Sequence, residues 1–301
     1  MIRTAEKVVT RSWFSQKLID YYQLVKFRLT MTVVFSSALA FLIASTSDSS
    51  WSWWRLIALA LGGFMVTGAA NALNQVLERD YDKLMRRTMD RPLATGRMTV
   101  SEGVMAAGLM SLVGITVLSL LHPLAGFFGT LAMLSYAFVY TPLKRVSPVA
   151  IPVGAIPGAL PTLIGCVAAD SAITPLALAL FGIQFFWQFP HFWSIGWLGY
   201  EDYQKAGYKL LPGVDGVPDQ QSGLQSFYFA LLLLPLILWL PLNGWGGPVF
   251  AAVAVIATLY YAALGWKLYK GCDRSSALRL MFGSFFYLPL VLLTLYFDII
   301  F

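Results

Sequence analysis

Residues 103–143 read GVMAAGLMSLVGITVLSLLHPLAGFFGTLAMLSYAFVYTPL and contain no Asp, Glu, Lys or Arg. A helix needs about 20 apolar residues to cross the hydrocarbon core of a bilayer, so this stretch fits two crossings, with a turn at His122-Pro123. Strands of a membrane barrel would alternate polar and apolar residues, and continuous apolar runs such as residues 230–240 do not. The sequence therefore predicts membrane-spanning helices.

Composition extends this prediction to the whole chain. Of the 301 residues, 58% are hydrophobic and only 12% are charged, and the mean hydropathy is +0.68. A soluble domain carries about 25% charged residues, so this chain could not cover a water-facing surface. These values exclude a soluble enzyme, a nucleic-acid-binding domain and a disordered chain. The lipid bilayer is the expected surrounding of the protein, with no nucleic acid as a partner.

Charge-poor stretches elsewhere complete the count of spans. Residues 146–200 hold a single charge, Asp170, and residues 220–266 hold none, so each stretch again fits two spans. The expected turns lie near Asp170 and at Asn243-Gly244. Single spans are expected at 29–45, 54–77 and 280–297. We therefore predict an all-α integral membrane protein with nine transmembrane helices, which form one domain over residues 29–301.

Lys and Arg predict the orientation of this domain. With nine spans, 20 of the 21 basic residues fall on one side, and only Arg55 lies on the other. Basic loops stay in the cytoplasm, so we expect a cytoplasmic N-terminus and a C-terminus on the opposite side. Residues 1–28 alternate basic and aromatic side chains without a long apolar core. They are expected to form a cytoplasmic amphipathic segment that lies at the membrane surface.

A polar run follows the second predicted span, at residues 71–88, and reads NALNQVLERDYDKLMRRT. If the helix continues through it, Asn74, Glu78 and Asp82 are spaced by four residues and share one face, with Asn71 just above them. Amide and carboxylate oxygens at an aqueous edge suit Mg²⁺ together with a phosphate-bearing substrate. The alternative is a solvated helix end whose acids pair with neighbouring Arg and Lys. The buried amides favour a binding site, because polar groups are costly inside a membrane.

Further polar side chains stand at the same predicted cytoplasmic level. Tyr140 and Lys144 lie four residues apart at the end of one span, and Asp202 directly follows another. Inside that second span, Trp187 and His191 share a helical face. Cations at this level can bind the anionic head of a substrate, or of lipid; the candidates are Lys26, Arg28, Arg91, Arg97, Lys144 and Arg145.

These residues favour a membrane enzyme with its site at the cytoplasmic interface, where Mg²⁺ and a diphosphate bind above an apolar cavity. The rival class is a secondary transporter. Transporters place ionisable groups near the middle of the membrane, and the middle of nearly every predicted span is uncharged here.

The motifs together resemble the UbiA superfamily of intramembrane prenyltransferases over nearly the whole chain. The resemblance is carried by residues 74–93, 140–145, 154–165, 187–193 and 201–212. The most specific string is WQFPHFW at residues 187–193, which is similar to the branch of the superfamily that uses haem b as the acceptor. The alternative within the superfamily is an aromatic quinone precursor as the acceptor.

The resemblance implies transfer of a farnesyl group from farnesyl diphosphate to the 2-vinyl group of haem b, with addition of water. It also implies a UbiA-like helical bundle with its cavity on the cytoplasmic side, with haem b as a substrate and Mg²⁺ as the cofactor. The implied metal-binding residues are Asn74, Glu78, Asp82 and Asp202, and Lys144 acts on the diphosphate. The implied substrate-binding residues are Lys26, Asn71, Arg91, Tyr140, Arg145, Trp187 and His191.

Three departures from the superfamily pattern stand in the sequence. Glu78 replaces the usual Asp, Leu198 replaces an acid four residues before Asp202, and Phe27 replaces a Pro. The resemblance further implies a bacterial inner membrane, in preference to the mitochondrial inner membrane, with the C-terminus in the periplasm. A haem A synthase or an oxidase assembly factor is an expected partner.

Overall fold

The computed structural model describes residues 12–46, 52–213 and 216–301, and these residues are helical without any strand. The long helices are α2 (Phe27–Ser45), α3 (Trp53–Asp82), α5 (Val100–Leu121), α6 (Pro123–Leu134), α8 (Ala150–Asp170), α9 (Pro175–Leu198), α11 (Gln220–Leu231), α12 (Leu233–Leu242), α13 (Pro248–Gly271) and α14 (Arg274–Ile300). The short helices are α1 (Trp13–Leu24), α4 (Pro92–Thr95), α7 (Thr141–Leu143) and α10 (Tyr200–Lys205). A π-helical segment, η1 (Ser135–Tyr140), joins α6 to α7.

The turns between helices fall where the sequence predicts them. His122 separates α5 from α6, and its side chain accepts a hydrogen bond from the amide of Leu124 at 3.2 Å. Thr174 caps α9 in the same way through the amide of Ala177. Both α6 and α9 begin with a proline, which suits the first position of a helix because no intrahelical donor is lost there. The predicted turns at 122–123, near 170 and at 243–244 are confirmed.

Eight helical stretches of the described chain are long and apolar enough to cross a membrane. The helix α9 is not among them, although its 24 residues have the length of a crossing. It carries Gln184, Gln188 and His191, and it is packed among α8, α11, α12 and α14, so its polar groups face protein. The all-helical membrane class is confirmed. The count of nine spans and the division at residue 29 stay predictions.

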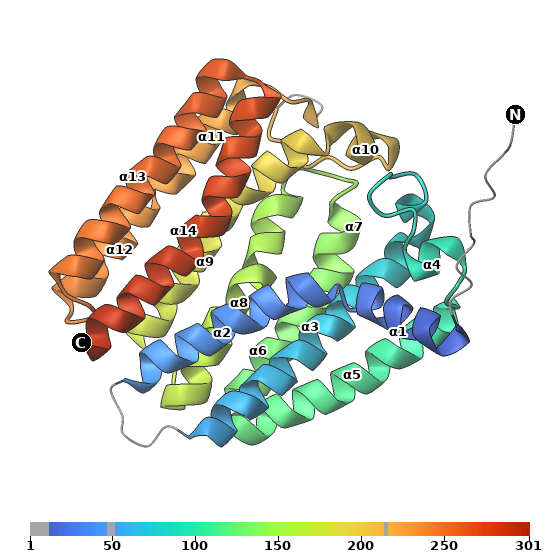
Figure 1. Ribbon diagram of the computed structural model, residues 1–301, viewed down its shortest axis with the longest axis horizontal. Helices are drawn as coiled ribbons and strands as arrows, with labels where there is room; N and C mark the ends of the chain where they lie inside the picture. The colour runs from blue at the N-terminus through green and yellow to red at the C-terminus, as the bar shows by residue number, and fades with distance from the viewer. Residues whose placement is uncertain (1–11, 47–51, 214–215) are drawn as a thin grey trace, which may run out of the picture.

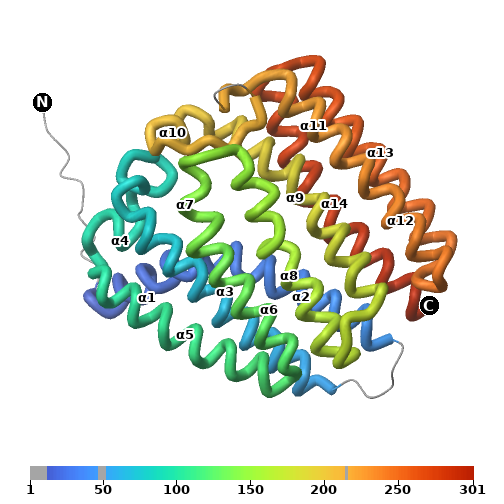
Figure 2. Tube along the Cα trace, turned by 180° about the vertical axis from the view of Figure 1, so that it is seen from behind, coloured from blue at the N-terminus to red at the C-terminus, as the bar shows by residue number. Residues whose placement is uncertain are grey.

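The helices form one bundle in which successive long stretches run in opposite directions, with α11 and α12 forming one such stretch and α6, η1 and α7 another (Figures 1 and 2). The helix α2 packs on α8, α3 packs on α5, and α13 packs on both α11 and α14. Both views place α4, α10 and the α7–α8 connection at one end of the bundle. The turns after α5, α8 and α12 lie at the other end, with the C-terminus. The candidate residues of the polar clusters therefore gather at one end.

The helix α1 is amphipathic. Its exposed side carries Trp13, Phe14 and Leu18, with exposed fractions of 75%, 66% and 56%. Its buried side carries Asp20, which pairs with Arg97 at 2.9 Å. An apolar face that is left open beside a membrane bundle fits the predicted surface-lying segment. The first eleven residues of that segment lie outside the described residues.

Candidate active site

The helix α3 continues without a break through its polar run, as the four-residue spacing requires. Asn74, Glu78 and Asp82 share one face and are buried, with exposed fractions of 1%, 5% and 1%. The Asn74 side-chain amide donates to Glu78 Oε2 at 2.8 Å and to Thr141 Oγ1 at 3.0 Å. This hydrogen bonding fixes the amide so that its oxygen Oδ1 points away from Glu78. We call these three residues the acidic face of α3.

Three cations from different parts of the chain contact this face. Lys26 Nζ donates to Asn74 Oδ1 at 2.6 Å. Lys144 forms an ion pair with Glu78. Arg91 binds both oxygens of Asp82 at 2.8 Å each. Both buried carboxylates of this face are therefore paired, because an unpaired one would be very costly, and the three cations exceed the two carboxylates by one formal positive charge.

Burial lowers the pKa of two of these cations. Lys26 and Lys144 both have a pKa below the usual lysine range, chiefly because burial penalises the charged form. The neighbouring Arg91 lowers both values further, and the Glu78 carboxylate opposes the shift. A bound polyanion would raise the two pKa values in the same way as Glu78 does, because it stabilises the charged ammonium groups. Lys26 and Lys144 are therefore suited to binding a diphosphate.

Lys26 reaches the acidic face through an unusual turn between α1 and α2. Its φ of 47° lies in the left-handed region, which is uncommon for a residue with a side chain. Amides of α3 hold this turn. Asn71 donates to the carbonyl of Val25 at 3.3 Å and to Thr30 Oγ1 at 3.1 Å, and Gln75 donates to the last two carbonyls of α1 at 2.8 Å each. Asn71 thus both lines the cavity described below and positions Lys26.

Aromatic rings surround Lys144. Its Nζ lies 5.0 Å from the ring centre of Tyr140 and 5.2 Å from that of Tyr208. The Tyr208 hydroxyl is buried and lies against the Glu78 carboxylate without a well-formed hydrogen bond. Burial and the nearby Glu78 charge raise the pKa of Tyr208, so the phenol stays protonated and can donate. Sequence reasoning missed Tyr208, because the residue sits in a loop and its only local signal is the preceding Ala-Gly pair.

A small cavity of about 240 Å³ opens beside these groups. It is lined by Leu77, Glu78, Tyr81, Phe138, Thr141, Pro142, Arg145 and Tyr208. The Arg145 guanidinium lies 4.1 Å from the ring centre of Tyr81 and donates to its hydroxyl. Arg145 is thus at the site, but it contacts Tyr81 and not the acidic face.

Asp202 stands apart from the acidic face in its contacts. It lies in the first turn of α10 and pairs with Lys205 at 3.5 Å. The two polar loops do approach each other, because Arg87 donates to the Tyr203 hydroxyl at 3.3 Å. The sequence therefore placed Asp202 at the correct end of the bundle, and its role in metal binding stays a prediction.

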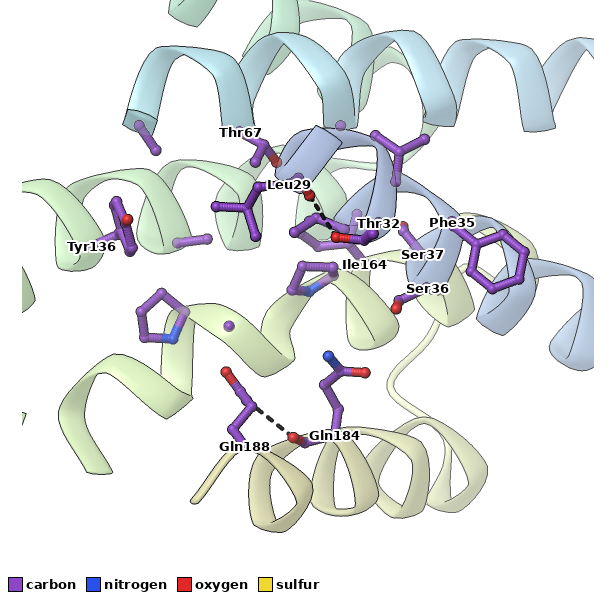
Figure 3. Close-up of a pocket in the computed structure, with 18 of the residues that line it drawn as sticks. Leu29, Thr32, Phe35, Ser36, Ser37, Thr67, Tyr136, Ile164, Gln184 and Gln188 are labelled. Carbon is purple, nitrogen blue, oxygen red and sulfur yellow. Dashed lines mark hydrogen bonds between the residues drawn. The ribbon is translucent and has the colours of Figure 1, made fainter. Parts of the chain in front are cut away.

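A larger cavity of about 350 Å³ runs into the bundle between α2, α3, α8, α9 and α14. Its walls are mostly apolar, and it extends from Asn71 and Tyr140 to Gln184 and His191. Figure 3 shows Gln184 and Gln188 pointing inward from α9 toward α8. The Gln188 amide donates to the carbonyl of Ala155 on α8 at 3.0 Å. An apolar cavity that starts beside a charged cluster fits a substrate with an anionic head and a hydrocarbon tail.

Trp187 and His191 lie on the cavity wall as the helical spacing predicts. Their rings stack at 4.9 Å between centres, with 16° between their planes. The Trp187 indole donates to the carbonyl of Ser284 at 2.9 Å, and His191 Nδ1 is 2.8 Å from Ser284 Oγ. Ser284 belongs to α14, nearly a hundred positions away in the chain, so spacing could not reveal this contact.

The donor chemistry of the acidic face fits a hard divalent cation. It offers an amide oxygen and two carboxylates, the oxygen ligands that Mg²⁺ takes, beside a cavity where a phosphate could supply the others. No group of three or more His, Cys, Asp or Glu suited to a metal occurs within the described residues. The site is therefore suited to a metal that shares its ligands with a bound substrate, rather than to a fully protein-bound ion.

Comparison with known sequences supports this picture. The sequence model of the UbiA prenyltransferase family matches residues 33–289. The protoheme IX farnesyltransferase of Cytophaga hutchinsonii is 41% identical over 279 residues, which cover 92% of this chain and 96% of that protein. The enzyme of the same name from Flavobacterium psychrophilum is 39% identical over 90% of this chain and 91% of that protein.

Solved structures share the fold. A digeranylgeranylglyceryl phosphate synthase superposes with a TM-score of 0.79 at 17% identity and covers 95% of this chain and 99% of its own. A UbiA homologue from Archaeoglobus fulgidus, bound to GPP and Mg²⁺, superposes with a TM-score of 0.67 at 16% identity, over 93% of this chain and 99% of its own. At these identities the likeness concerns the fold.

Proposed function

The chain belongs to the UbiA prenyltransferase family, and on that premise we propose that it transfers a farnesyl group from farnesyl diphosphate to the 2-vinyl group of haem b. Addition of water at the vinyl group and release of diphosphate complete the reaction of a haem O synthase. The observation that carries this proposal is the identity of 34–41% to protoheme IX farnesyltransferases over most of the chain. The charged cluster above an apolar cavity supplies the matching chemistry.

The acidic face and its cations would divide the work on the diphosphate. Asn74, Glu78 and Asp82 would hold Mg²⁺, which supplies charge neutralisation for the leaving diphosphate when bound. Lys144, Arg91 and Lys26 are close enough to this face to bind the remaining phosphate oxygens. Tyr208 offers a hydroxyl donor beside Glu78. Arg145 and Asp202 would contribute from the edge of the site.

The large cavity would receive the hydrocarbon part of the substrates. Its apolar lining excludes water from the reacting carbon, which protects an allylic cation from premature hydrolysis. The faces of Tyr140 and Trp187 can stabilise positive charge that passes along the prenyl chain. Asn71 closes the cavity at the end nearest the acidic face.

We place the protein in a bacterial inner membrane, with the site and the N-terminus on the cytoplasmic side. The distribution of basic residues supports this orientation, since 20 of the 21 lie in the segments assigned to the cytoplasm. Haem b and farnesyl diphosphate would be its small-molecule partners. A haem A synthase or an oxidase assembly factor would be its protein partner in haem delivery.

A competition experiment tests the choice of acceptor. Purified protein in detergent is given farnesyl diphosphate, Mg²⁺ and equal amounts of haem b and an aromatic hydroxy acid, and both acceptors are then analysed by mass spectrometry. We expect farnesyl only on the haem. Farnesyl on the aromatic acid with unmodified haem would instead assign a quinone-type prenyltransferase. Consumption of no diphosphate with either acceptor would revive the transporter class.

A further inference from the structure

Within residues 12–46, 52–213 and 216–301, the His191 side chain hydrogen-bonds through one ring nitrogen, Nδ1, to Ser284 Oγ at 2.8 Å. The Ser284 hydroxyl already donates its single proton to the carbonyl of Met281 at 2.5 Å. With that proton directed at the Met281 carbonyl, Ser284 Oγ accepts from the imidazole, which assigns the proton of neutral His191 to Nδ1. The other nitrogen, Nε2, is left with a free lone pair.

His191 lines the large cavity. Its Nε2 has no hydrogen-bond partner in the described part of the chain, and it is not one of the fully enclosed, unpartnered side-chain atoms there. The ring cannot turn easily, because Trp187 stacks on one face and the Phe285 ring packs against it at 5.2 Å with 67° between the planes. A rigid imidazole thus presents a lone pair to an apolar space.

This arrangement is unusual for a histidine with a purely structural role. A packed histidine gains by using both nitrogens, since a polar atom without a partner in an apolar setting is unfavourable. Here the supporting groups, Ser284 and Trp187, hold the ring in place and leave Nε2 open. The same design occurs in metal sites, where a second hydrogen bond fixes the tautomer and the orientation of a ligating imidazole.

We propose that His191 Nε2 is an axial ligand of the iron in the porphyrin substrate and that Ser284 is the residue that positions it. The inference rests on the proposed function, which brings an iron porphyrin to this cavity. Imidazole is a common ligand of iron, and the apolar walls suit a porphyrin ring. The bond would fix the macrocycle over one point of α9, so that one vinyl group is presented to the prenyl chain.

The composition of the chain makes this proposal easy to test. The sequence contains two histidines, and the other, His122, caps α6 at the turn after α5. Protein carrying a histidine-free affinity tag thus has one candidate imidazole ligand in the cavity. The matched variants are His191→Gly, Ser284→Ala and, as the control, His122→Ala. Each is titrated with haem b, and with iron-free protoporphyrin IX, in the absence of farnesyl diphosphate.

We expect wild-type and His122→Ala protein to bind haem b with the absorption and magnetic circular dichroism spectra of imidazole-bound iron. His191→Gly should lose this signature, and adding free imidazole should restore it. Ser284→Ala should weaken haem affinity by about 10-fold, the lower end of what loss of a supporting contact to a metal ligand costs. Binding of iron-free protoporphyrin should be the same in all four proteins.

Two outcomes would overturn the inference. One is an unchanged haem spectrum in His191→Gly, and the other is an equal loss of affinity for haem and for iron-free protoporphyrin, which would indicate a packing role. Each variant is also assayed beside the wild type for haem farnesylation. Wild-type protein that farnesylates haem, together with either outcome, rejects the ligation alone. Wild-type protein that binds and farnesylates no haem rejects the proposed function itself.

Discussion

At the scale of single residues, the site depends on pairs of oppositely charged groups that are buried together. Arg91 and Asp82 are the clearest pair, with two contacts of 2.8 Å and a carboxylate that is 1% exposed. Two positions earlier on α3, Asp80 carries the same functional group in water, paired with Lys83 at 2.8 Å and largely exposed. A comparison of Asp82 with Asp80 therefore separates the effect of where a carboxylate lies from the effect of its charge.

Replacing these acids one at a time tests the acidic face. Asp82→Asn removes a metal-binding carboxylate and leaves Arg91 without its partner, so farnesyl transfer should fall by about 100-fold or more in kcat/KM. Asp80→Asn alters only a solvated ion pair, and such pairs contribute about 0–1 kcal/mol, so its kinetics should stay within about twofold of the wild type. Equal losses in both variants would show that the face has no special role.

Tyr208 allows a test in which stability and binding separate. Tyr208→Phe removes a buried hydroxyl that lies against Glu78 without a well-formed hydrogen bond, so the melting temperature should change little. If that hydroxyl donates to the diphosphate, the KM for farnesyl diphosphate should increase several-fold, as expected for loss of a hydrogen bond of about 1–2 kcal/mol. Tyr228→Phe, on the exposed outer surface, is the control. An unchanged KM would remove Tyr208 from the site.

At the scale of helices, the positions of turns and of shared faces could be predicted from the sequence, because both follow from local periodicity. The acidic face of α3 and the Trp187–His191 pair follow from four-residue spacing in a continuous helix. The left-handed turn at Lys26 and the supporting contact of Ser284 could not be predicted, since both depend on helices that are distant in the chain. Asp202 shows the same limit. Its position next to a span predicts the end of the bundle at which it lies, but it does not predict which residue it contacts.

Substitution of a glycine where α8 packs on α9 tests how tightly the cavity wall is packed. A Cβ at Gly158 would collide with the Gln188 side chain, which is fixed by hydrogen bonds to Ala155 and Gln184. Gly158→Ala should therefore destabilise the protein by about 1–3 kcal/mol, the usual cost of overpacking. Gly108→Ala places its Cβ in open space on α5, and it should be neutral or stabilising by up to about 1 kcal/mol. Thermal unfolding in detergent compares the two, and an equal effect would contradict the packing.

At the scale of the whole molecule, the number of crossings decides where the two ends of the chain lie. Eight crossings would put both ends on one side of the membrane, whereas nine put them on opposite sides. The difference is α9, which has the length of a span but a polar, protein-facing surface. Both views of the bundle place the C-terminus at the end opposite α10 (Figures 1 and 2).

Labelling with a membrane-impermeant thiol reagent tests this count. Cys272 is exposed in the connection between α13 and α14, on the predicted cytoplasmic side, and the other cysteine, Cys166, is buried. In cells with a permeabilised outer membrane, Cys272 should react only after the inner membrane is broken. A cysteine introduced by Phe301→Cys, in a Cys272→Ser background, should react in the unbroken cells. Protection of both positions would favour eight crossings.

The central claim is that the acidic face holds a metal-bound diphosphate while the cavity presents farnesyl to haem. The most direct test is the mass of haem b after incubation of purified protein with farnesyl diphosphate and Mg²⁺, with and without a chelator. We predict a gain of one farnesyl group plus one water, which disappears in the chelator and returns when Mg²⁺ is restored. A haem of unchanged mass, or a gain that persists without divalent metal, would contradict the account.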